Sequence, residues 1–150
     1  MPRTYTQLLS HIVFSTKERR PMLAPELGVR LFAYMGGIIR QLDGVSLLIN
    51  GVADHVHILA SLPATIAPSE FVGKLKANSS RWVHENFPEH RRFAWQLGYS
   101  AFSVSVSQKQ GVLDYIAGQE EHHRKVPYQE ELIAFLKKHE IEYDERYVFE

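Results

Sequence analysis

The chain of 150 residues contains no cysteine, and this absence removes two classes of structure. Without thiols the chain can form neither a disulfide framework nor a zinc site closed by thiolate ligands. A metal site, if there is one, must use nitrogen and oxygen donors. A chain free of cysteine also fits a reducing compartment, and we expect a cytoplasmic protein.

Long apolar runs are lacking as well. No stretch approaches the roughly 20 consecutive apolar residues that a membrane-spanning helix needs, so we expect no membrane partner. The opening MPRTYTQLLSHIVFSTKERR has neither a clean apolar core nor a small-residue cleavage site, and we expect no signal peptide. Hydrophobic residues make up 45% and charged residues 23%, which is typical of one globular domain of this length.

An excess of charge of either sign is also missing, because 17 basic residues balance 17 acidic ones. This balance argues against a protein that binds nucleic acid through its overall charge. The distribution is uneven, however: residues 1–119 carry a balance of +4 and residues 120–150 a balance of −4. The front part of the chain could therefore hold phosphate locally.

Hydrophobic periodicity predicts strands that alternate with helices. The predicted strands cover residues 5–15, 45–51, 54–62 and 101–107, and the predicted helices cover residues 24–44, 69–87, 107–126 and 129–138. The order β-α-β-β-α-β, followed by further helix, predicts an α+β fold of the ferredoxin-like kind. We expect an antiparallel sheet with helices on one face, plus a C-terminal helix that follows the last strand.

Several local signals set the expected boundaries of these elements. Asn50-Gly51 is typical of a hairpin turn, and Ser69 is a candidate N-cap. Ser107 with Gln110 fits a capping box at the start of the helix 107–126. Trp82 is expected in the core.

Residues 51–60, GVADHVHILA, place two histidines on one short strand. Since side chains i and i+2 of a strand share a face, His55 and His57 point the same way, opposite to Val56 and Ile58. We expect the pair to project from the sheet face away from the core, where two imidazoles can converge on one cation. Two histidines that merely face solvent are the plainer alternative.

The predicted helix after the last strand carries Tyr115 and Gln119, which are four residues apart and so share one helical face. The amide oxygen of Gln119 suits magnesium or manganese, and the phenol of Tyr115 becomes a nucleophile once its proton is removed. Gly118 lies between them and weakens the helix by roughly 1 kcal/mol. A packed aromatic is the plainer interpretation of Tyr115.

Other polar residues near these motifs are not expected to be metal ligands or bases. We expect no carboxylate ligand or base beside these motifs, because Asp54 should point to the opposite face from His55 and Asp114 only adjoins Tyr115. His11 is expected to be structural. His122 and His123 could extend a basic edge of the protein if they are partly protonated.

The combination DHVHIL on a strand and YIAGQ on a later helix resembles the single-tyrosine HUH transposases, small bacterial enzymes that mobilise insertion sequences through single-stranded DNA. The segments HIVFSTKERRPML, LKANSSRWV, WQLGYSAFSVS and HEIEYDERYVF are similar to that family too. The resemblance covers nearly the whole chain in the right order. It implies a single HUH transposase-like domain over residues 1–150 of a bacterial, cytoplasmic protein.

The resemblance also implies a mechanism. His55, His57 and Gln119 would bind a divalent cation, Mg²⁺ or Mn²⁺, and Tyr115 would attack a phosphodiester of single-stranded DNA beside a hairpin. The products would be a 5′-phosphotyrosine linkage and a free 3′-hydroxyl, ready for strand transfer. The family further implies a homodimer, in which the tyrosine helix of one subunit can complete the site of the other.

Contacts with DNA are expected from basic side chains in three regions and from stacking on Trp82 and Trp95. The candidates for phosphate contact are Lys17, Arg19, Arg20, Lys74, Lys76, Arg81, Arg91, Arg92 and Lys109. For each of them an ordinary solvated position is the alternative.

Three other functions remain open at this point. The chain could be a domesticated relative that nicks hairpins of repetitive elements, or a single-stranded DNA-binding module whose chemistry has lapsed. It could also be an unrelated metal hydrolase that uses the two histidines and has no need of Tyr115.

Overall fold

The computed structural model describes residues 3–149; residues 1–2 and 150 of the domain predicted over 1–150 lie outside the described residues. Its centre is a four-stranded antiparallel sheet in the order β2-β3-β1-β4. The strands are β1 (Leu9–Ser15), β2 (Val45–Val52), β3 (His55–Ser61) and β4 (Ser100–Ser103). The predicted ferredoxin-like arrangement is confirmed, because this strand order follows from a β-α-β-β-α-β chain.

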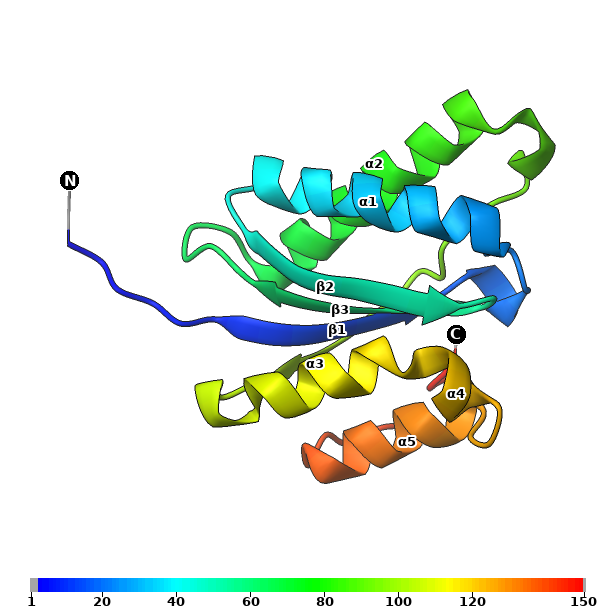
Figure 1. Cartoon of the computed structure of the whole chain (residues 1–150). Coiled ribbons are helices and arrows are strands. Elements are labelled where there is room, and N and C mark those ends of the chain that lie inside the picture. The colour runs from blue at the N-terminus through cyan, green and yellow to red at the C-terminus, as the bar shows by residue number, and fades with distance from the viewer. Residues whose placement is uncertain (1–2, 150) are drawn as a thin grey trace.

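One face of the sheet is covered by α1 (Pro25–Gln41) and α2 (Pro68–Asn86), as Figure 1 shows. Leu27, Leu31 and Met35 recur at helical spacing along α1 and are buried against the sheet. They pack against Val56, Ile58 and other alternate residues of the strands in the main hydrophobic cluster. This layer is the core of the domain.

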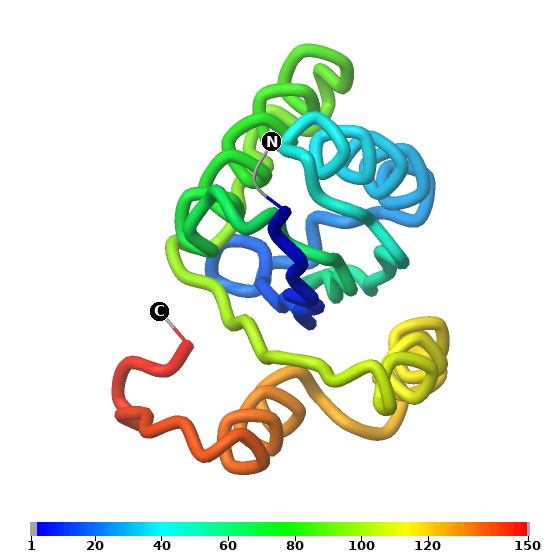
Figure 2. Tube along the Cα trace, turned by 90° about the vertical axis from the view of Figure 1, so that its left-hand side faces the viewer, coloured from blue at the N-terminus to red at the C-terminus, as the bar shows by residue number. Residues whose placement is uncertain are grey.

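The opposite face is covered by a second helical layer, made of α3 (Lys109–Ala117), α4 (Gln119–His123) and α5 (Tyr128–Lys138). Figure 2, turned by 90°, shows the same two layers with the sheet between them. Val13 and Phe102 pack against α5, and Leu59 packs against α3. Because both faces are covered, nearly every residue of β1 and β3 is buried.

Three short 3₁₀ helices join these elements, namely η1 (Lys17–Arg19), η2 (Pro88–His90) and η3 (Val106–Gln108). Two of the predicted strands are shorter than expected. β1 begins at Leu9 and not at residue 5, and β4 ends at Ser103 because the chain turns into η3. Val106, inside the predicted strand 101–107, lies in η3 and is 67% exposed.

The predicted helix 107–126 is two helices, α3 and α4. Gly118 ends α3 with φ −92° and ψ 19°, so the axis breaks between Tyr115 and Gln119. The predicted capping box is wrong, because Gln110 donates a hydrogen bond to Asp114 instead.

The predicted N-cap of α2 at Ser69 is wrong. The residue before the helix is Ala67, and Pro68 at the first helical position sets its backbone in place of a Ser69 cap. Trp82 is only half-buried and stacks on Tyr34 at the edge of the core.

The hairpin between β2 and β3 turns at Ala53-Asp54, so the predicted Asn50-Gly51 turn is wrong. Gly51 lies inside β2, paired with Val56. A Cβ atom placed there would lie 2.3 Å from the carbonyl oxygen of His55. Glycine is needed at this position for a close approach between two strands and not for a turn.

Among residues 3–149, no helix has both the length and the apolar character that crossing a lipid bilayer requires.

Gly51→Ala should lower the free energy of unfolding by about 1–3 kcal/mol, because the added methyl group meets strand backbone that has no room to move. Gly73→Ala is the matched control: Gly73 is exposed in α2 and a Cβ there meets nothing within 4 Å. The control should be stabilised by roughly 0.5–1 kcal/mol. Denaturant unfolding of both variants measures the difference, and equal stabilities would contradict the close approach of the two strands at Gly51.

Candidate metal and tyrosine site

Strand β3 directs His55 and His57 onto the face covered by the second helical layer, as their spacing predicts. Both side chains have an exposed fraction of 0%. The expectation that the pair lies outside any core is therefore wrong. The reason is the second layer, which covers this face with α3, α4 and α5 (Figure 1).

Each of the two imidazoles is oriented by a hydrogen bond at its Nδ1 atom. His55 Nδ1 lies 2.7 Å from Asp54 Oδ1, and His57 Nδ1 lies 2.8 Å from His11 Nε2. Partners at one ring nitrogen fix the other nitrogen as a potential ligand, so both Nε2 atoms face the same region. The expectation that Asp54 plays no part here is wrong, because the tight turn brings it back onto His55; His11 is structural, as expected.

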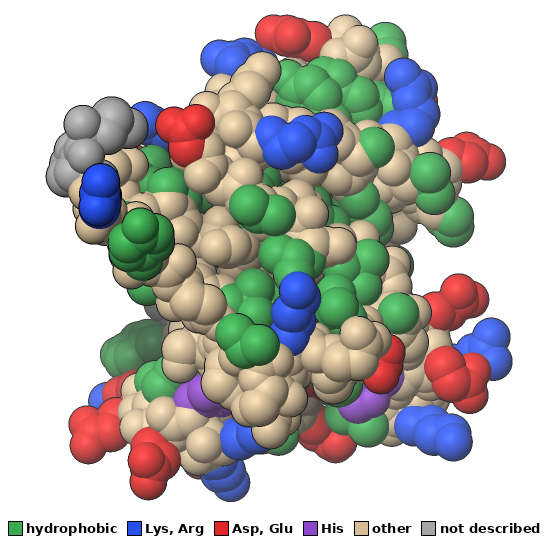
Figure 3. All heavy atoms as spheres, turned by 60° about the vertical axis from the view of Figure 1, so that its left-hand side comes forward, with side chains coloured by type: hydrophobic (Ala, Val, Ile, Leu, Met, Phe, Trp, Pro, Cys, Tyr) green, Lys and Arg blue, Asp and Glu red, His purple; other side chains and the backbone are tan. Residues whose placement is uncertain are grey.

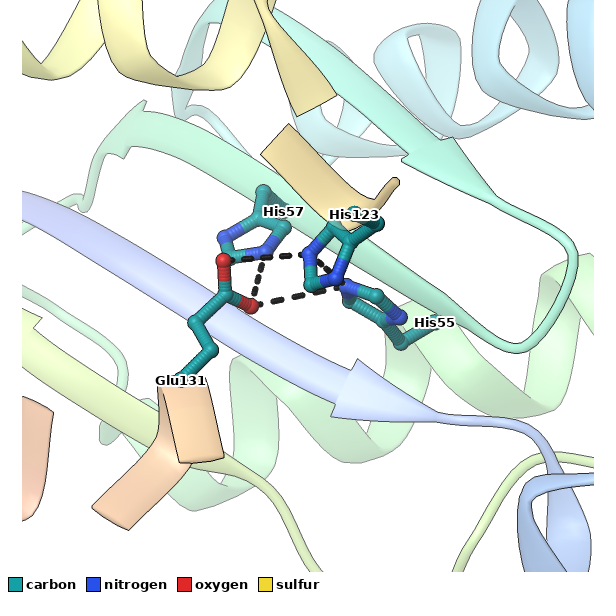
Figure 4. Close-up of side chains that lie close together, drawn as sticks. All are labelled: His55, His57, His123 and Glu131. Carbon is teal, nitrogen blue, oxygen red and sulfur yellow. Dashed lines mark hydrogen bonds and ion pairs between the residues drawn. The ribbon is translucent and has the colours of Figure 1, made fainter. Parts of the chain in front are cut away.

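Glu131 of α5 lies at the centre of this region and is 3% exposed. Its Oε1 atom is 2.9 Å from His57 Nε2 and 3.5 Å from His55 Nε2. Its Oε2 atom is 3.1 Å from His123 Nε2 and from His122 Nε2. Figure 4 shows the carboxylate pointing from α5 towards the three imidazoles of His55, His57 and His123.

His123 of α4 is the third imidazole, and its side chain is only 8% exposed. Its Nε2 atom lies 2.9 Å from His55 Nε2 and 2.8 Å from Gln119 Oε1. The expectation that His123 extends an exposed basic edge is wrong, because α4 turns it inward. Its Nδ1 atom is buried with no hydrogen-bond partner among the described residues.

Tyr115 of α3 reaches the same cluster within one chain. Its hydroxyl oxygen lies 3.0 Å from His122 Nε2, and the hydroxyl donates a hydrogen bond to Glu131 Oε2. The Tyr115 and His57 ring centroids are 5.8 Å apart. Burial and the contact with Glu131 raise the pKa of Tyr115 above its ordinary value of 10. The phenol therefore keeps its proton in this arrangement.

Gln119 begins α4 and is fully buried. Its amide oxygen accepts a hydrogen bond from His123, and its amide nitrogen donates to the backbone oxygen of Tyr115 at 3.2 Å. Gln119 thus joins the cluster through His123, which in turn contacts His55. The structure brings all four motif residues into one connected group.

Burial decides the protonation of two of the histidines. It lowers the pKa of His57 to about 4 and that of His11 to about 3, so both rings are neutral near pH 7. Burial also opposes the charged form of His55, but hydrogen bonds with Asp54 and Glu131 outweigh it and raise the pKa. For Glu131, burial is outweighed by hydrogen bonds from His123, His55 and His57, which hold its pKa far below 4.5.

A divalent cation fits this group. Among residues 3–149, His55, His57, His123 and Glu131 can each offer one ligand atom, all within 4.8 Å of one another. Neighbouring donors are 2.9–3.5 Å apart, close to the roughly 3 Å between adjacent ligands that each sit about 2.1 Å from one ion. Imidazole nitrogens and carboxylate oxygens are suitable donors for divalent metals.

A surface pocket of about 650 Å³ borders the cluster and shares Asp54 and His123 with it. Among the predicted DNA contacts, Arg19 lines this pocket, together with Arg124. The remaining lining residues are Pro21, Val52, Ala53, Glu120, Pro127, Tyr128 and Gln129. A strand of DNA could therefore approach the cluster beside two guanidinium groups.

The other predicted DNA contacts are spread over the surface. Seven of these side chains are exposed, namely Lys17, Arg20, Lys74, Arg81, Arg91, Arg92 and Lys109. On the face drawn in Figure 3, basic side chains are scattered and form no continuous patch, and acidic side chains are most frequent towards the lower edge, where basic ones lie among them.

Two of the predicted DNA contacts, Lys76 and Trp95, have partners within the fold. The amine of Lys76 donates hydrogen bonds to the backbone oxygens of Gln96 and Gly98, which occupies its charge within the fold. Trp95 is buried beside Phe14 and donates its indole hydrogen to Ser79. Trp95 is therefore unsuited to stacking on a base.

Glu131 and His123 are the site residues that the sequence interpretation missed. One signal for Glu131 was present, since it falls within the apolar stripe of α5 formed by Tyr128, Leu132 and Phe135. A carboxylate at core spacing indicates a buried partner. A signal for His123 was present as well, since it lies four residues after Gln119 and so shares one face of α4 with it.

The free energy of unfolding of the metal-free protein should fall as the pH drops from about 6.5 to about 4. The unfolded chain binds protons at His11 and His57 near pH 6.5, whereas the folded protein resists until their lowered pKa values of about 3 and 4. Each histidine can contribute up to about 1.4 kcal/mol per pH unit. Denaturant unfolding in the presence of a chelator measures this slope.

His11→Gln should make that slope shallower, while His90→Gln, a substitution in η2 outside the cluster, should leave it unchanged. A slope that is the same in all three proteins would contradict burial of neutral imidazoles at this site.

Comparison with known proteins shows the family of the chain. A family model described as "Transposase IS200 like" matches residues 4–119. The transposase for insertion sequence element IS200 of Salmonella typhimurium is 31% identical over 132 residues, which cover 79% of this chain and 84% of that protein. The corresponding transposase of Salmonella typhi gives the same values.

Two solved structures share the fold. A chain from Deinococcus radiodurans R1, described as a transposase, has a TM-score of 0.64 at 23% identity and covers 79% of this chain and 95% of its own length. A REP-associated tyrosine transposase bound to a REP hairpin has a TM-score of 0.60 at 14% identity, over 84% of this chain and 74% of its own. The chain belongs to the IS200-like transposase family, whose members are enzymes that act on DNA.

Proposed function

We propose that this transposase cleaves single-stranded DNA beside a hairpin and transfers the strand through a 5′-phosphotyrosine intermediate on Tyr115, with a divalent cation, Mg²⁺ or Mn²⁺. One observation carries the proposal. The hydroxyl of Tyr115 and the Nε2 atoms of His55 and His57 converge on the same buried carboxylate within one chain. A single domain over residues 1–150 would thus carry the whole site.

The two imidazoles would hold the cation, with Gln119 as a third donor after a shift of His123. When bound, the cation neutralises charge on the non-bridging oxygens of the scissile phosphate. His11 and Asp54 keep the two rings oriented through their Nδ1 atoms. The neutral state of His57 leaves its Nε2 lone pair free for this role.

Tyr115 would supply the nucleophile. Its phenolic oxygen bonds to phosphorus, the bond from phosphorus to the 3′-oxygen breaks, and the phenolic proton is released. The 3′-oxygen leaves as a hydroxyl after taking a proton from solvent. Because the broken end stays attached to the protein, the same bond energy serves to join it to another 3′-hydroxyl, which suits strand transfer and not degradation.

The phenol must exchange partners before it reacts. In this structure Tyr115 donates its proton to a hydrogen bond with Glu131, and burial together with that contact raises its pKa. Attack therefore requires that the hydroxyl leave Glu131 for the scissile phosphate. The break at Gly118 between α3 and α4 gives the backbone a place to adjust.

A hairpin substrate is supported by the family and by one neighbour in fold, the REP-associated tyrosine transposase bound to a REP hairpin. We propose that Arg19, at the pocket beside His123, contacts a phosphate next to the scissile one. The exposed basic side chains Lys17, Arg20, Lys74, Arg81, Arg91, Arg92 and Lys109 remain candidates for further phosphate contacts. Lys76 is no longer among the candidates.

The same neighbour favours a second candidate function, a domesticated nickase of repetitive hairpins. Both functions use the same chemistry, and the DNA around the gene separates them: insertion-element ends on both sides favour the mobile transposase. A homodimer is also proposed from the family. We propose that Tyr115 acts in the site of its own chain, because its hydroxyl contacts Glu131 there.

Tyr115→Phe should abolish the covalent adduct with DNA, because the variant lacks the attacking oxygen. Wild-type protein is mixed with single-stranded hairpin oligonucleotides and Mn²⁺ or Mg²⁺, and a denaturing gel reports the protein–DNA adduct. The variant should still bind the hairpin with an affinity within about threefold of wild type.

Tyr147→Phe is the matched control, since Tyr147 is 56% exposed and outside the cluster, and its adduct yield should equal that of the wild type. An adduct formed equally well by Tyr115→Phe would show that another residue is the nucleophile.

His57→Ala should lose both cleavage and affinity for Mn²⁺, since it removes one of the two imidazoles of β3 that would hold the cation. Isothermal titration calorimetry measures the metal, and the adduct assay measures cleavage. His84→Ala, exposed in α2 outside the cluster, should change neither. Cleavage by His57→Ala at the wild-type rate would refute the proposed metal site.

A further inference from the structure

We infer that Glu131 is a ligand of the cation, supplied by the C-terminal helix α5 in addition to the histidine pair. This inference rests on the proposed function, because it concerns the same ion. It adds a negatively charged donor to the neutral set of His55, His57 and Gln119 that the resemblance implies. Glu131 also lies beyond residues 4–119, where the family model ends.

The carboxylate is placed as a metal ligand would be. Oε1 lies 2.9 Å from His57 Nε2 and 3.5 Å from His55 Nε2, and Oε2 lies 3.1 Å from His123 Nε2. Figure 4 shows that these three imidazoles and the carboxylate face one common space. Donors at such spacing can bind one ion after shifts of a few tenths of an ångström to about one ångström.

The charge of Glu131 points to the same role. A carboxylate that is 3% exposed needs a positive partner, because an isolated buried charge is costly. Within residues 3–149, every ion-pair partner of Glu131 is a histidine, and no lysine or arginine lies within 4.0 Å of it. A divalent cation would provide the compensation that no fixed positive side chain provides.

Helix α5 is anchored well enough to deliver this ligand. Leu132 and Leu136 pack with Val13 and Phe102 of the sheet. Tyr128, one turn before Glu131, lies against the ring of His55 with a centroid distance of 4.6 Å. Because Glu131 is fixed between these contacts, the ion and the C-terminal segment should stabilise each other.

A carboxylate ligand changes what the site can do. Two imidazoles and an amide leave the full double charge on the ion, whereas one carboxylate reduces the net charge to +1. The ion is then held more tightly but polarises a phosphate less. The chain should therefore retain its metal between rounds of reaction, and the phosphate would compete with Glu131 for the ion.

Binding of Mn²⁺ without DNA tests the inference. The free-ion signal in electron paramagnetic resonance is followed during titration of wild type, Glu131→Gln and Glu130→Gln. Glu131→Gln should bind at least tenfold more weakly. Glu130→Gln makes the same change in charge at an exposed neighbouring position of α5, and should bind like wild type. Equal affinities for Glu131→Gln and wild type would overturn the inference.

Hydrogen exchange supplies a readout that does not depend on the variant folding well. In the wild type, Mn²⁺ should slow amide exchange in α5 (Tyr128–Lys138) as well as in β3. Glu130→Gln should show the same slowing. Slowing in β3 with no change in α5 would overturn the inference and leave the proposed function intact. A wild type that binds no Mn²⁺ and forms no DNA adduct would overturn both.

Discussion

The contacts between the buried carboxylate of Glu131 and the surrounding histidines join the second helical layer to the sheet. Glu131 lies on α5, His123 on α4, and His55 and His57 on β3, so four side chains join the second helical layer to the sheet. The same carboxylate accepts the hydroxyl proton of Tyr115 in a hydrogen bond. The positions and the protonation of Tyr115, His55 and His57 therefore depend on Glu131.

Because successive side chains of a β-strand point to opposite faces of the sheet, the histidine site lies on one face of β3 and the main hydrophobic core on the other. Alternate residues of β3, Val56 and Ile58, belong to the main hydrophobic cluster beneath α1 and α2, while His55 and His57 face the second layer. A sheet buried on both faces thus stabilises the fold with one set of side chains and presents the candidate site residues with the other. Removing water from the histidine side strengthens the electrostatic interactions there.

The sequence predicted the parts of this arrangement that follow from regular spacing. Strand periodicity placed His55 and His57 on one face, and the order of elements indicated the ferredoxin-like sheet. The parts that depend on tertiary contacts were missed. Gly51 was taken for a turn because its close approach to the His55 carbonyl is invisible in the sequence. Glu131 and His123 were missed because the packing of α4 and α5 on β3 brings residues together that are far apart in the sequence.

The central claim, that the two imidazoles, Glu131 and Tyr115 gather around one ion, is tested most directly by anomalous diffraction from crystals grown with Mn²⁺. The account predicts a single strong anomalous peak about 2.2 Å from Nε2 of His55 and His57, with an oxygen of Glu131 at a similar distance and Tyr115 beside it. A peak elsewhere in the protein, with no anomalous signal between the two imidazoles at saturating Mn²⁺, would contradict it.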